Sequence, residues 1–215
     1  LGVRVVAGDT KVVPRGQGGG LYLTTTGVGV RPNETLLGPE LIRPGDRLLV
    51  SGPFGDHGIA VMLAREAFDL SGPVRSDCAA VTPLTSAIAD IAGVRFMRDP
   101  TRGGLATVAH EIAAMTKLEV RLHEPAIPVQ DAVRSVCAIL GYDAYYLACE
   151  GRVVAVVAPE DADRVLALWR AIPDGAGASI IGIIGEGRPR VILETEIGGQ
   201  RMLEELEDDP LPRIC

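Results

Sequence analysis

Residues 94–115 read VRFMRDPTRGGLATVAHEIAAM and contain a strand pattern, a turn and a helix pattern in succession. The first four residues, 94–97, are typical of a short β-strand. Asp99 is predicted to cap the helix that follows, with Pro100 in its first turn. The apolar residues after the glycines recur at helical spacing: Leu105, Val108, Ala109, Ile112 and Met115. This order predicts a layered domain in which helices pack against a sheet.

The turn Arg102-Gly103-Gly104 is not explained by helix capping. Two glycines in a first helical turn cost roughly 1 kcal/mol each relative to alanine. Such glycines are usually found where the backbone approaches a ligand or another segment closely. The sequence therefore leaves two interpretations open, a ligand site and close packing.

Strand and helix patterns alternate on both sides of this segment and predict an α/β, or layered α+β, domain. Strands are expected at 47–51, 119–122, 153–157, 180–184 and 190–193. Helices are expected after His57, around Leu84 to Ile91, and over 129–140 and 159–169. A turn is expected at Gly198-Gly199.

The stretch before this domain contains two β-rich runs, 3–7 and 21–30. Two strands do not form a stable unit alone, so we expect their partners in missing sequence or in another subunit. Residues 31–46 are rich in helix and strand breakers. The expected domains are 1–33, 34–205 and 206–215.

The glycine-rich loop 52–58 follows a predicted strand and precedes a predicted helix. This geometry can offer backbone N–H groups to an anion. Its spacing matches neither common phosphate-binding loop, so a plain tight connection is favoured over a phosphate cradle. His57 is interpreted as a loop residue.

The composition limits the partners and the compartment. A net charge of −7 argues against binding to nucleic acid. No run of 18 apolar residues predicts a membrane span, so a cytoplasmic protein without membrane contact is expected. The four cysteines form no CxxC pair, and Cys137 and Cys149 are expected to be buried free thiols. Neither a zinc site nor a disulfide framework is expected.

The chain ends in Pro210-Leu211-Pro212-Arg213-Ile214-Cys215. The prolines disfavour helix and central strand, and from Asp208 to Cys215 such a tail could extend on the order of 20 Å. Two interpretations are open: an arm that carries a reactive thiol, or a frayed terminus with an idle one.

Four motifs together resemble the HypE family of hydrogenase maturation proteins. They are the segment 8–13 (GDTKVV), the segment 98–105 (RDPTRGGL), Glu150-Gly151 and the terminal 212–215 (PRIC). The resemblance covers the whole chain but only about the latter two-thirds of a family member. It implies a PurM-like carboxy-terminal domain preceded by the remnant of a β-rich amino-terminal domain, and a homodimer when full length. Cys149 stands where the family is expected to have asparagine.

The chemistry that the resemblance implies is synthesis of the cyanide ligands of [NiFe]-hydrogenase. A HypF-type carbamoyltransferase transfers a carbamoyl group to Cys215, which must therefore be a sulfur nucleophile. ATP with Mg²⁺ then drives dehydration to a thiocyanate, and the cyano group passes to iron on the HypC–HypD complex.

The resemblance also implies roles for individual residues. Glu150 is the candidate general base for the N–H proton, and Lys11 is the candidate cation near it. Asp9 and the turn Arg102-Gly103-Gly104 are weaker candidates for phosphate or metal contact. No residue is assigned as a metal ligand.

Two other functions stay open. One is another ATP-dependent member of the same superfamily, resembling aminoimidazole ribonucleotide synthetase or selenophosphate synthetase, although neither needs a terminal cysteine. The other is a non-enzymatic carrier that presents Cys215 to partners without acting on ATP.

Overall fold

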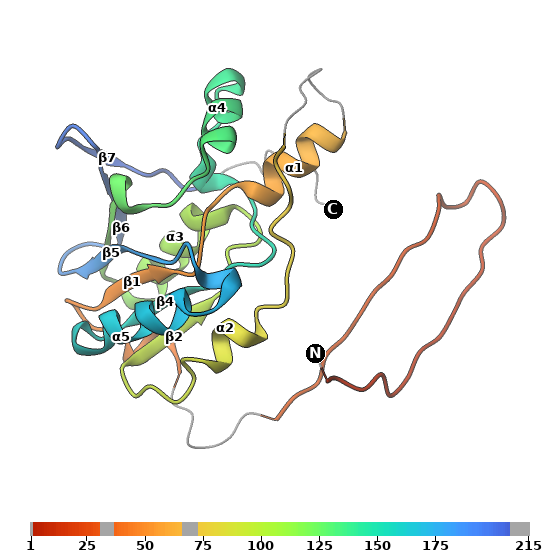
Figure 1. Cartoon of the computed structure of the whole chain (residues 1–215), viewed down its shortest axis with the longest axis horizontal. Coiled ribbons are helices and arrows are strands. Elements are labelled where there is room, and N and C mark those ends of the chain that lie inside the picture. The colour runs from red at the N-terminus through yellow and green to blue at the C-terminus, as the bar shows by residue number, and fades with distance from the viewer. Residues whose placement is uncertain (1, 31–36, 66–72, 207–215) are drawn as a thin grey trace. The chain divides into compact units, whose positions relative to one another are not determined.

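The computed structural model describes residues 2–30, 37–65 and 73–206 (Figure 1). The chain divides into two units, Leu1–Thr35 and Leu36–Cys215, which are described separately. The predicted tail, including Cys215, lies outside the described residues.

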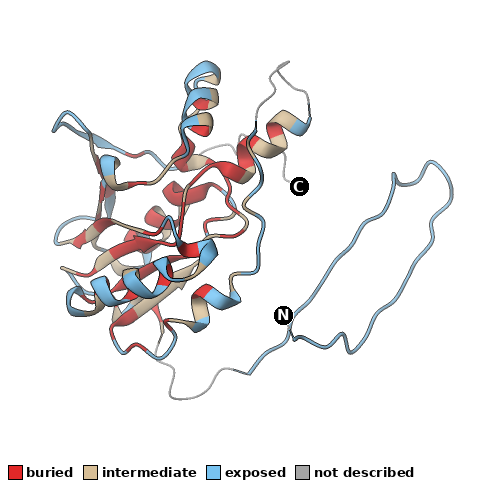
Figure 2. Ribbon diagram, viewed as in Figure 1, coloured by how far each residue is buried: buried red, intermediate tan, exposed pale blue. Residues whose placement is uncertain are grey.

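Residues 2–30 of the first unit contain no strand, so the predicted strands at 3–7 and 21–30 are wrong for this structure. Their side chains are exposed, as Figure 2 shows, with Val5 at 92% and Val28 at 97%. The physical reason is that neither run pairs with a strand of the described residues, which would complete its backbone hydrogen bonds and cover its apolar side chains.

The second unit is built on a seven-stranded sheet with the order β2-β4-β1-β5-β3-β6-β7. Each strand predicted in this unit is confirmed to within about two residues. The bounds are β1 (Arg47–Val50), β2 (Val94–Arg98), β3 (Glu119–His123), β4 (Val154–Val157), β5 (Ser179–Gly185), β6 (Arg190–Glu194) and β7 (Gln200–Met202). Strands β3 and β6 pair in parallel, and the other neighbours are antiparallel.

Among the described residues, five α-helices accompany the sheet. They are α1 (Asp56–Ala64), α2 (Thr82–Ser86), α3 (Gly104–Thr116), α4 (Asp131–Leu140) and α5 (Pro159–Arg170). Short 3₁₀ turns complete the described elements: η1 (Pro39–Leu41), η2 (Glu124–Ala126), η3 (Ala144–Tyr146) and η4 (Pro173–Gly175). The turn predicted at Gly198-Gly199 is confirmed between β6 and β7, where the Thr195 N–H donates to the Gly199 carbonyl at 2.8 Å.

Helices cover both faces of the sheet. Leu48 and Val50 of β1 belong to the apolar cluster that contains Leu105 and other residues of α3. Leu49, which lies between them, belongs to the cluster with Trp169 of α5. Successive side chains of a strand point to opposite faces, so α3 and α5 pack on opposite faces. Figure 2 shows the buried sheet between them. The layered α/β fold is confirmed.

A third apolar cluster joins α1, α4 and the η3 turn through Ile59, Val133 and Leu147. Cys137 lies in this cluster and Cys149 in the one beneath α3. Both are buried free thiols, as predicted. Burial raises the pKa of Cys137 to about 11.

Two expectations about helix starts are wrong. Helix α3 begins at Gly104, with Gly103 at its N-cap, so Asp99 does not cap it and Pro100 is not in its first turn. The reason is that Gly103 and Gly104 have φ values of 66° and 58°, and this left-handed pair keeps the helix from starting earlier in the chain. His57 is also not a loop residue, because α1 begins at Asp56.

None of the helices that the structure describes is long and apolar enough to cross a bilayer.

Candidate functional site

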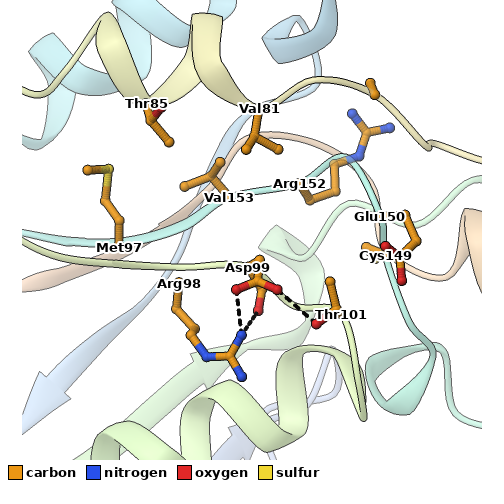
Figure 3. Close-up of a pocket in the computed structure, with 11 residues that line it drawn as sticks. Val81, Thr85, Met97, Arg98, Asp99, Thr101, Cys149, Glu150, Arg152 and Val153 are labelled. Atoms are coloured by element: carbon orange, nitrogen blue, oxygen red, sulfur yellow. Dashed lines mark hydrogen bonds and ion pairs between the residues drawn. The ribbon is translucent and has the colours of Figure 1, made fainter. Parts of the chain in front are cut away.

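A pocket of about 430 Å³ lies where the end of β2, the following turn, the segment before α2 and the loop before β4 meet (Figure 3). The loop 149–152 supplies Cys149, Glu150 and Arg152, and the turn after β2 supplies Asp99 and Thr101. These groups come from segments about 50 residues apart in the sequence. The pocket therefore brings together two of the motifs that the sequence singled out.

The turn after β2 is ordered by its own side chains. Thr101 Oγ1 donates to Asp99 Oδ2 at 2.8 Å, and Arg98 Nη1 donates to Asp99 Oδ1 at 2.6 Å. Figure 3 shows Arg98 and Thr101 directed at Asp99. Burial alone would raise the pKa of Asp99, but the hydrogen bond from Thr101 and the charge of Arg98 lower it. Asp99 is therefore an ionised pocket group rather than a helix cap.

Glu150 lies half-buried in the wall of the pocket. Its backbone N–H donates to Asp77 Oδ1 at 3.0 Å, while its carboxylate has no hydrogen-bond or ion-pair partner within 2–30, 37–65 and 73–206. The carboxylate is thus free to accept a proton from a ligand. A fixed backbone and an unpaired carboxylate suit a general base.

Cys149 lines the same pocket but is fully buried. Its backbone N–H donates to the Pro100 carbonyl at 3.0 Å, which joins the two motifs directly. The Gly55 N–H lies 3.5 Å from its sulfur. Burial raises the pKa of this thiol well above its usual range, so Cys149 is a neutral packing group and a poor nucleophile.

The glycine loop before α1 behaves as a plain connection. Two N–H groups near the start of α1 face protein atoms: the Gly55 N–H points to the Cys149 sulfur, and the Gly58 N–H donates to the Ala148 carbonyl at 3.2 Å. These contacts favour the packing interpretation over a phosphate cradle at this loop.

The structure gives a packing reason for Gly104. A Cβ atom at this position would lie 2.6 Å from the carbonyl oxygens of both Tyr145 and Leu147. The first turn of α3 therefore touches the η3 backbone. Gly103 is buried as well, whereas Arg102 is exposed. Contact of any of the three with a ligand stays a prediction.

Asp9 and Lys11 lie in the first unit, where both are exposed. Asp9 Oδ1 accepts a hydrogen bond from the Thr10 N–H at 2.8 Å. Because the two units are described separately, the position of Asp9 and Lys11 relative to Glu150 is left open. Cys215 lies outside the described residues. Their roles stay predictions.

Three charged residues of this region were missed in the sequence. Arg152 is nearly buried between Asp56 and Asp77, with its Nη2 3.6 Å from Asp56 Oδ2 and its Nε 3.3 Å from Asp77 Oδ2. Gln130 Nε2 also donates to Asp56 Oδ2 at 2.7 Å. Burial raises the pKa of Asp56. The only signal in the sequence was the proximity of Arg152 to Glu150, since the partners are far away along the chain.

An exposed cation lies beside the pocket in the sequence. The guanidinium of Arg102, next to the pocket-lining Thr101, has no ion-pair or hydrogen-bond partner in the described part of the chain. It is available to a phosphate group. Among the same residues, no group of three or more His, Cys, Asp or Glu side chains could hold a metal ion.

Comparison with known proteins gives one family. The profile of the family described as "AIR synthase related protein, C-terminal domain" matches residues 43–194. The chain is also 46% identical to the carbamoyl dehydratase HypE of Cupriavidus necator, over the whole of this chain and 62% of that protein. The chain thus spans somewhat less than two-thirds of the length of this relative.

Solved structures give the same result. A crystal structure of HypE from Escherichia coli aligns with a TM-score of 0.82 at 42% identity, over 87% of this chain and 58% of that one. A HypE–HypF complex aligns at 0.76 and 35% identity, over 79% and 56% of the two chains. HypE in complex with ATP aligns at 0.76 and 36% identity, over 81% and 54%.

Proposed function

The chain belongs to the AIR synthase related protein family, and we propose that it contributes to a carbamoyl dehydratase of the HypE type in [NiFe]-hydrogenase maturation. The protein would dehydrate a carbamoyl group on Cys215 to a thiocyanate, the source of the cyanide ligands of the active-site iron. In this proposal 1–33 is part of an amino-terminal ATP-binding domain, 34–205 is the PurM-like domain and 206–215 is the carrier arm.

The observation that carries the proposal is the carboxylate of Glu150 in the pocket wall, which has no partner among the described residues. Forming a C≡N bond from a thiocarboxamide requires loss of an N–H proton to a base. Among the pocket residues, Asp99 is engaged by Arg98 and Thr101, and the Cys149 thiol is held neutral by burial. Glu150, whose carboxylate is unpaired within the part of the chain that the structure describes, is therefore the best placed of these groups to accept the proton.

Other residues are assigned to binding and orientation. Arg102 would pair with a phosphate group, and Lys11, with Asp9 beside it, would approach from the first unit to stabilise charge on the carbamoyl oxygen. ATP, when bound, would supply the phosphoryl group that makes this oxygen a better leaving group. Gly103 and Gly104 would shape the turn that presents Arg102.

The partners follow from the same proposal. A relative is found in a HypE–HypF complex, which supports a HypF-type carbamoyltransferase as the donor. The HypC–HypD complex would accept the cyano group, and the complete protein would be a cytoplasmic homodimer. Magnesium would accompany ATP, and Asp9 is a candidate for its contact, since Mg²⁺ beside a nucleotide is usually held by one or two carboxylates together with the phosphates.

Intact-mass spectrometry of the complete protein tests the proposal. We expect a carbamoyl adduct on Cys215 after incubation with the donor enzyme, carbamoyl phosphate and ATP, followed by loss of one water. The variant Cys215→Ser should take up no stable adduct. Mapping of the adduct to Cys78, or no adduct at all on a folded protein, would contradict the proposal.

The same labelling experiment on the 215-residue chain itself, together with a measurement of ATP binding, separates the carrier alternative. A carrier that presents Cys215 without using ATP is the second candidate. In that case the adduct would form on Cys215, but no water would be lost and ATP would not bind.

A further inference from the structure

The side chain of Asp77 contacts the loop 149–152 through both carboxylate oxygens. Asp77 lies in 73–81, a segment without helix or strand that precedes α2. Its Oδ1 accepts the hydrogen bond from the Glu150 N–H at 3.0 Å, across 73 positions of sequence, and its Oδ2 lies 3.3 Å from Arg152 Nε. The Asp77 side chain is fully buried. A buried carboxylate held by two neighbours in one loop has little freedom to move.

The backbones of the two segments also touch. A Cβ atom at Gly151 would lie 1.9 Å from the carbonyl oxygen of Asp77 and 3.0 Å from the Ala79 nitrogen. Any side chain at Gly151 is therefore excluded while Asp77 is in place. This contact explains why a glycine follows Glu150, without any requirement for unusual backbone angles.

Arg152, the partner of Asp77 in this contact, is itself held in place by other segments of the domain. Its Nε donates to the Pro53 carbonyl at 3.2 Å and its Nη1 to the Asp174 carbonyl at 3.1 Å, so it is held from two further segments. Its guanidinium also lies over Gly52, where a Cβ would be 2.8 Å from Nη1. Asp77 thus ties Glu150 to a group that the body of the domain holds in place.

We infer that Asp77 is a positioning residue for Glu150, an inference that rests on the proposed role of Glu150 as general base. Asp77 fixes the Glu150 backbone from one side, while the Cys149 N–H bond to Pro100 fixes the loop from the other. The carboxylate of Glu150 is then the part of this loop that can turn toward a ligand in the pocket. Without Asp77 the backbone of Glu150 would be less well fixed, and its carboxylate would be less precisely oriented toward the pocket.

Amide hydrogen exchange measured by NMR tests the contact itself and needs no activity. In Asp77→Ala, exchange at the Glu150 amide should rise by about tenfold or more, because the protecting acceptor is gone. Asp77→Asn keeps an acceptor oxygen but loses the charge that faces Arg152, so its exchange rate should fall between wild type and Asp77→Ala. The Val153 amide, which donates to Ser51 Oγ at 2.9 Å, is the internal reference.

A rise confined to Glu150 supports the inference, whereas an equal rise at Val153 would mean general loosening and would overturn it. Asp163→Ala, on the exposed side of α5, is the matched control that removes a carboxylate elsewhere. It should leave both amides unchanged.

Single-turnover dehydration in the complete protein tests the functional part. Asp77→Ala should lower the rate constant by about 10- to 100-fold with the KM for ATP unchanged, the size expected when a reacting group is displaced by about 1 Å. In a Glu150→Gln background, Asp77→Ala should lower the rate constant only slightly further, because both substitutions act through the Glu150 carboxylate.

The outcomes separate the two proposals. The positioning role would be overturned if the effects of Asp77→Ala and Glu150→Gln on the rate constant were fully additive. It would also be overturned if Asp77→Ala changed only the KM for ATP. If Glu150→Gln itself dehydrates at the wild-type rate, the proposed function of Glu150 fails instead.

Discussion

The sulfur of Cys149 lies 3.5 Å from the backbone nitrogen of Gly55, so the residue before the candidate base is buried against the start of α1. The Cys149 backbone N–H is bonded to Pro100 in addition. Cys149 therefore anchors the loop 149–152 on two sides, through its sulfur at the start of α1 and through its backbone N–H at the turn after β2. A cysteine can serve here because the position needs a small buried group rather than a reactive one.

The thiols of the described cysteines should react with alkylating reagents at different rates. Cys78 is exposed, whereas Cys137 and Cys149 are buried, and burial raises the pKa of Cys137 to about 11 and that of Cys149 further. Because the thiolate is the reactive form, iodoacetamide at pH 8 should label Cys78 long before the other two. Peptide mapping checks this, with a sample in denaturant as the control in which all of them react. Rapid labelling of Cys149 in the folded protein would contradict the description of the loop.

Gly104→Ala should destabilise the protein more than Gly141→Ala. Both glycines have positive φ, 58° and 73°, so alanine is strained at each by about 1–2 kcal/mol. Only at Gly104 would the new Cβ also meet two carbonyl oxygens at 2.6 Å, while nothing lies within 4 Å at Gly141. Thermal unfolding followed by circular dichroism measures the difference. Equal melting temperatures for the two variants would show that α3 does not pack against η3 in this way.

Trp169→Phe should lower the free energy of unfolding by about 1–3 kcal/mol, the cost of leaving a buried acceptor unpaired. The indole Nε1 donates to the Leu84 carbonyl at 3.0 Å, and the whole residue is buried between α5 and α2. Leu168→Ala, on the more exposed side of the same helix, is the matched control and should cost less. Urea unfolding should be followed by circular dichroism, because Trp169 is the single tryptophan.

Asp99→Asn should have a pH-dependent effect on stability. The pKa of Asp99 is lowered in the folded protein, so its ionised form contributes stability above the ordinary carboxyl pKa of about 3.9. That contribution is lost as the pH falls through the lowered value. The side chain is 54% exposed, so the difference from wild type near pH 7 should be below about 1 kcal/mol.

Urea unfolding of both proteins near pH 7 and at successively lower pH measures this difference. The difference in unfolding free energy between wild type and Asp99→Asn should shrink toward zero below the pKa of Asp99 in the folded protein. A gap that stays constant down to the lowest pH would show that the ion pair with Arg98 is not the cause. Asp163→Asn, on the exposed side of α5, serves as the surface control.

Local patterns in the sequence were sufficient to predict most strands and helices of the second unit. Strand runs such as 180–184 and the helix stripe of α5 are set by side-chain periodicity, and the layered fold follows from their alternation. The strands expected at 3–7 and 21–30 failed because strand formation depends on a partner that the pattern cannot supply.

Less of the candidate site than of the fold could be predicted from the sequence. Glu150 and the turn at Arg102 were found through motifs, but Asp77 and Arg152 act through contacts across 73 and 99 positions. Asp99 was assigned to capping because its local pattern fits a cap. The left-handed glycines that shift the helix start to Gly104 could not be recognised without the backbone.

The central claim is that Glu150 removes the proton in dehydration, and the most direct test is intact-mass analysis of Glu150→Gln in the complete protein. We predict that this variant accepts the carbamoyl group on Cys215 as wild type does but retains it, without loss of water, when ATP is present. Glu186→Gln, at an exposed position, should lose water normally. Loss of water from Glu150→Gln at the wild-type rate would contradict the account.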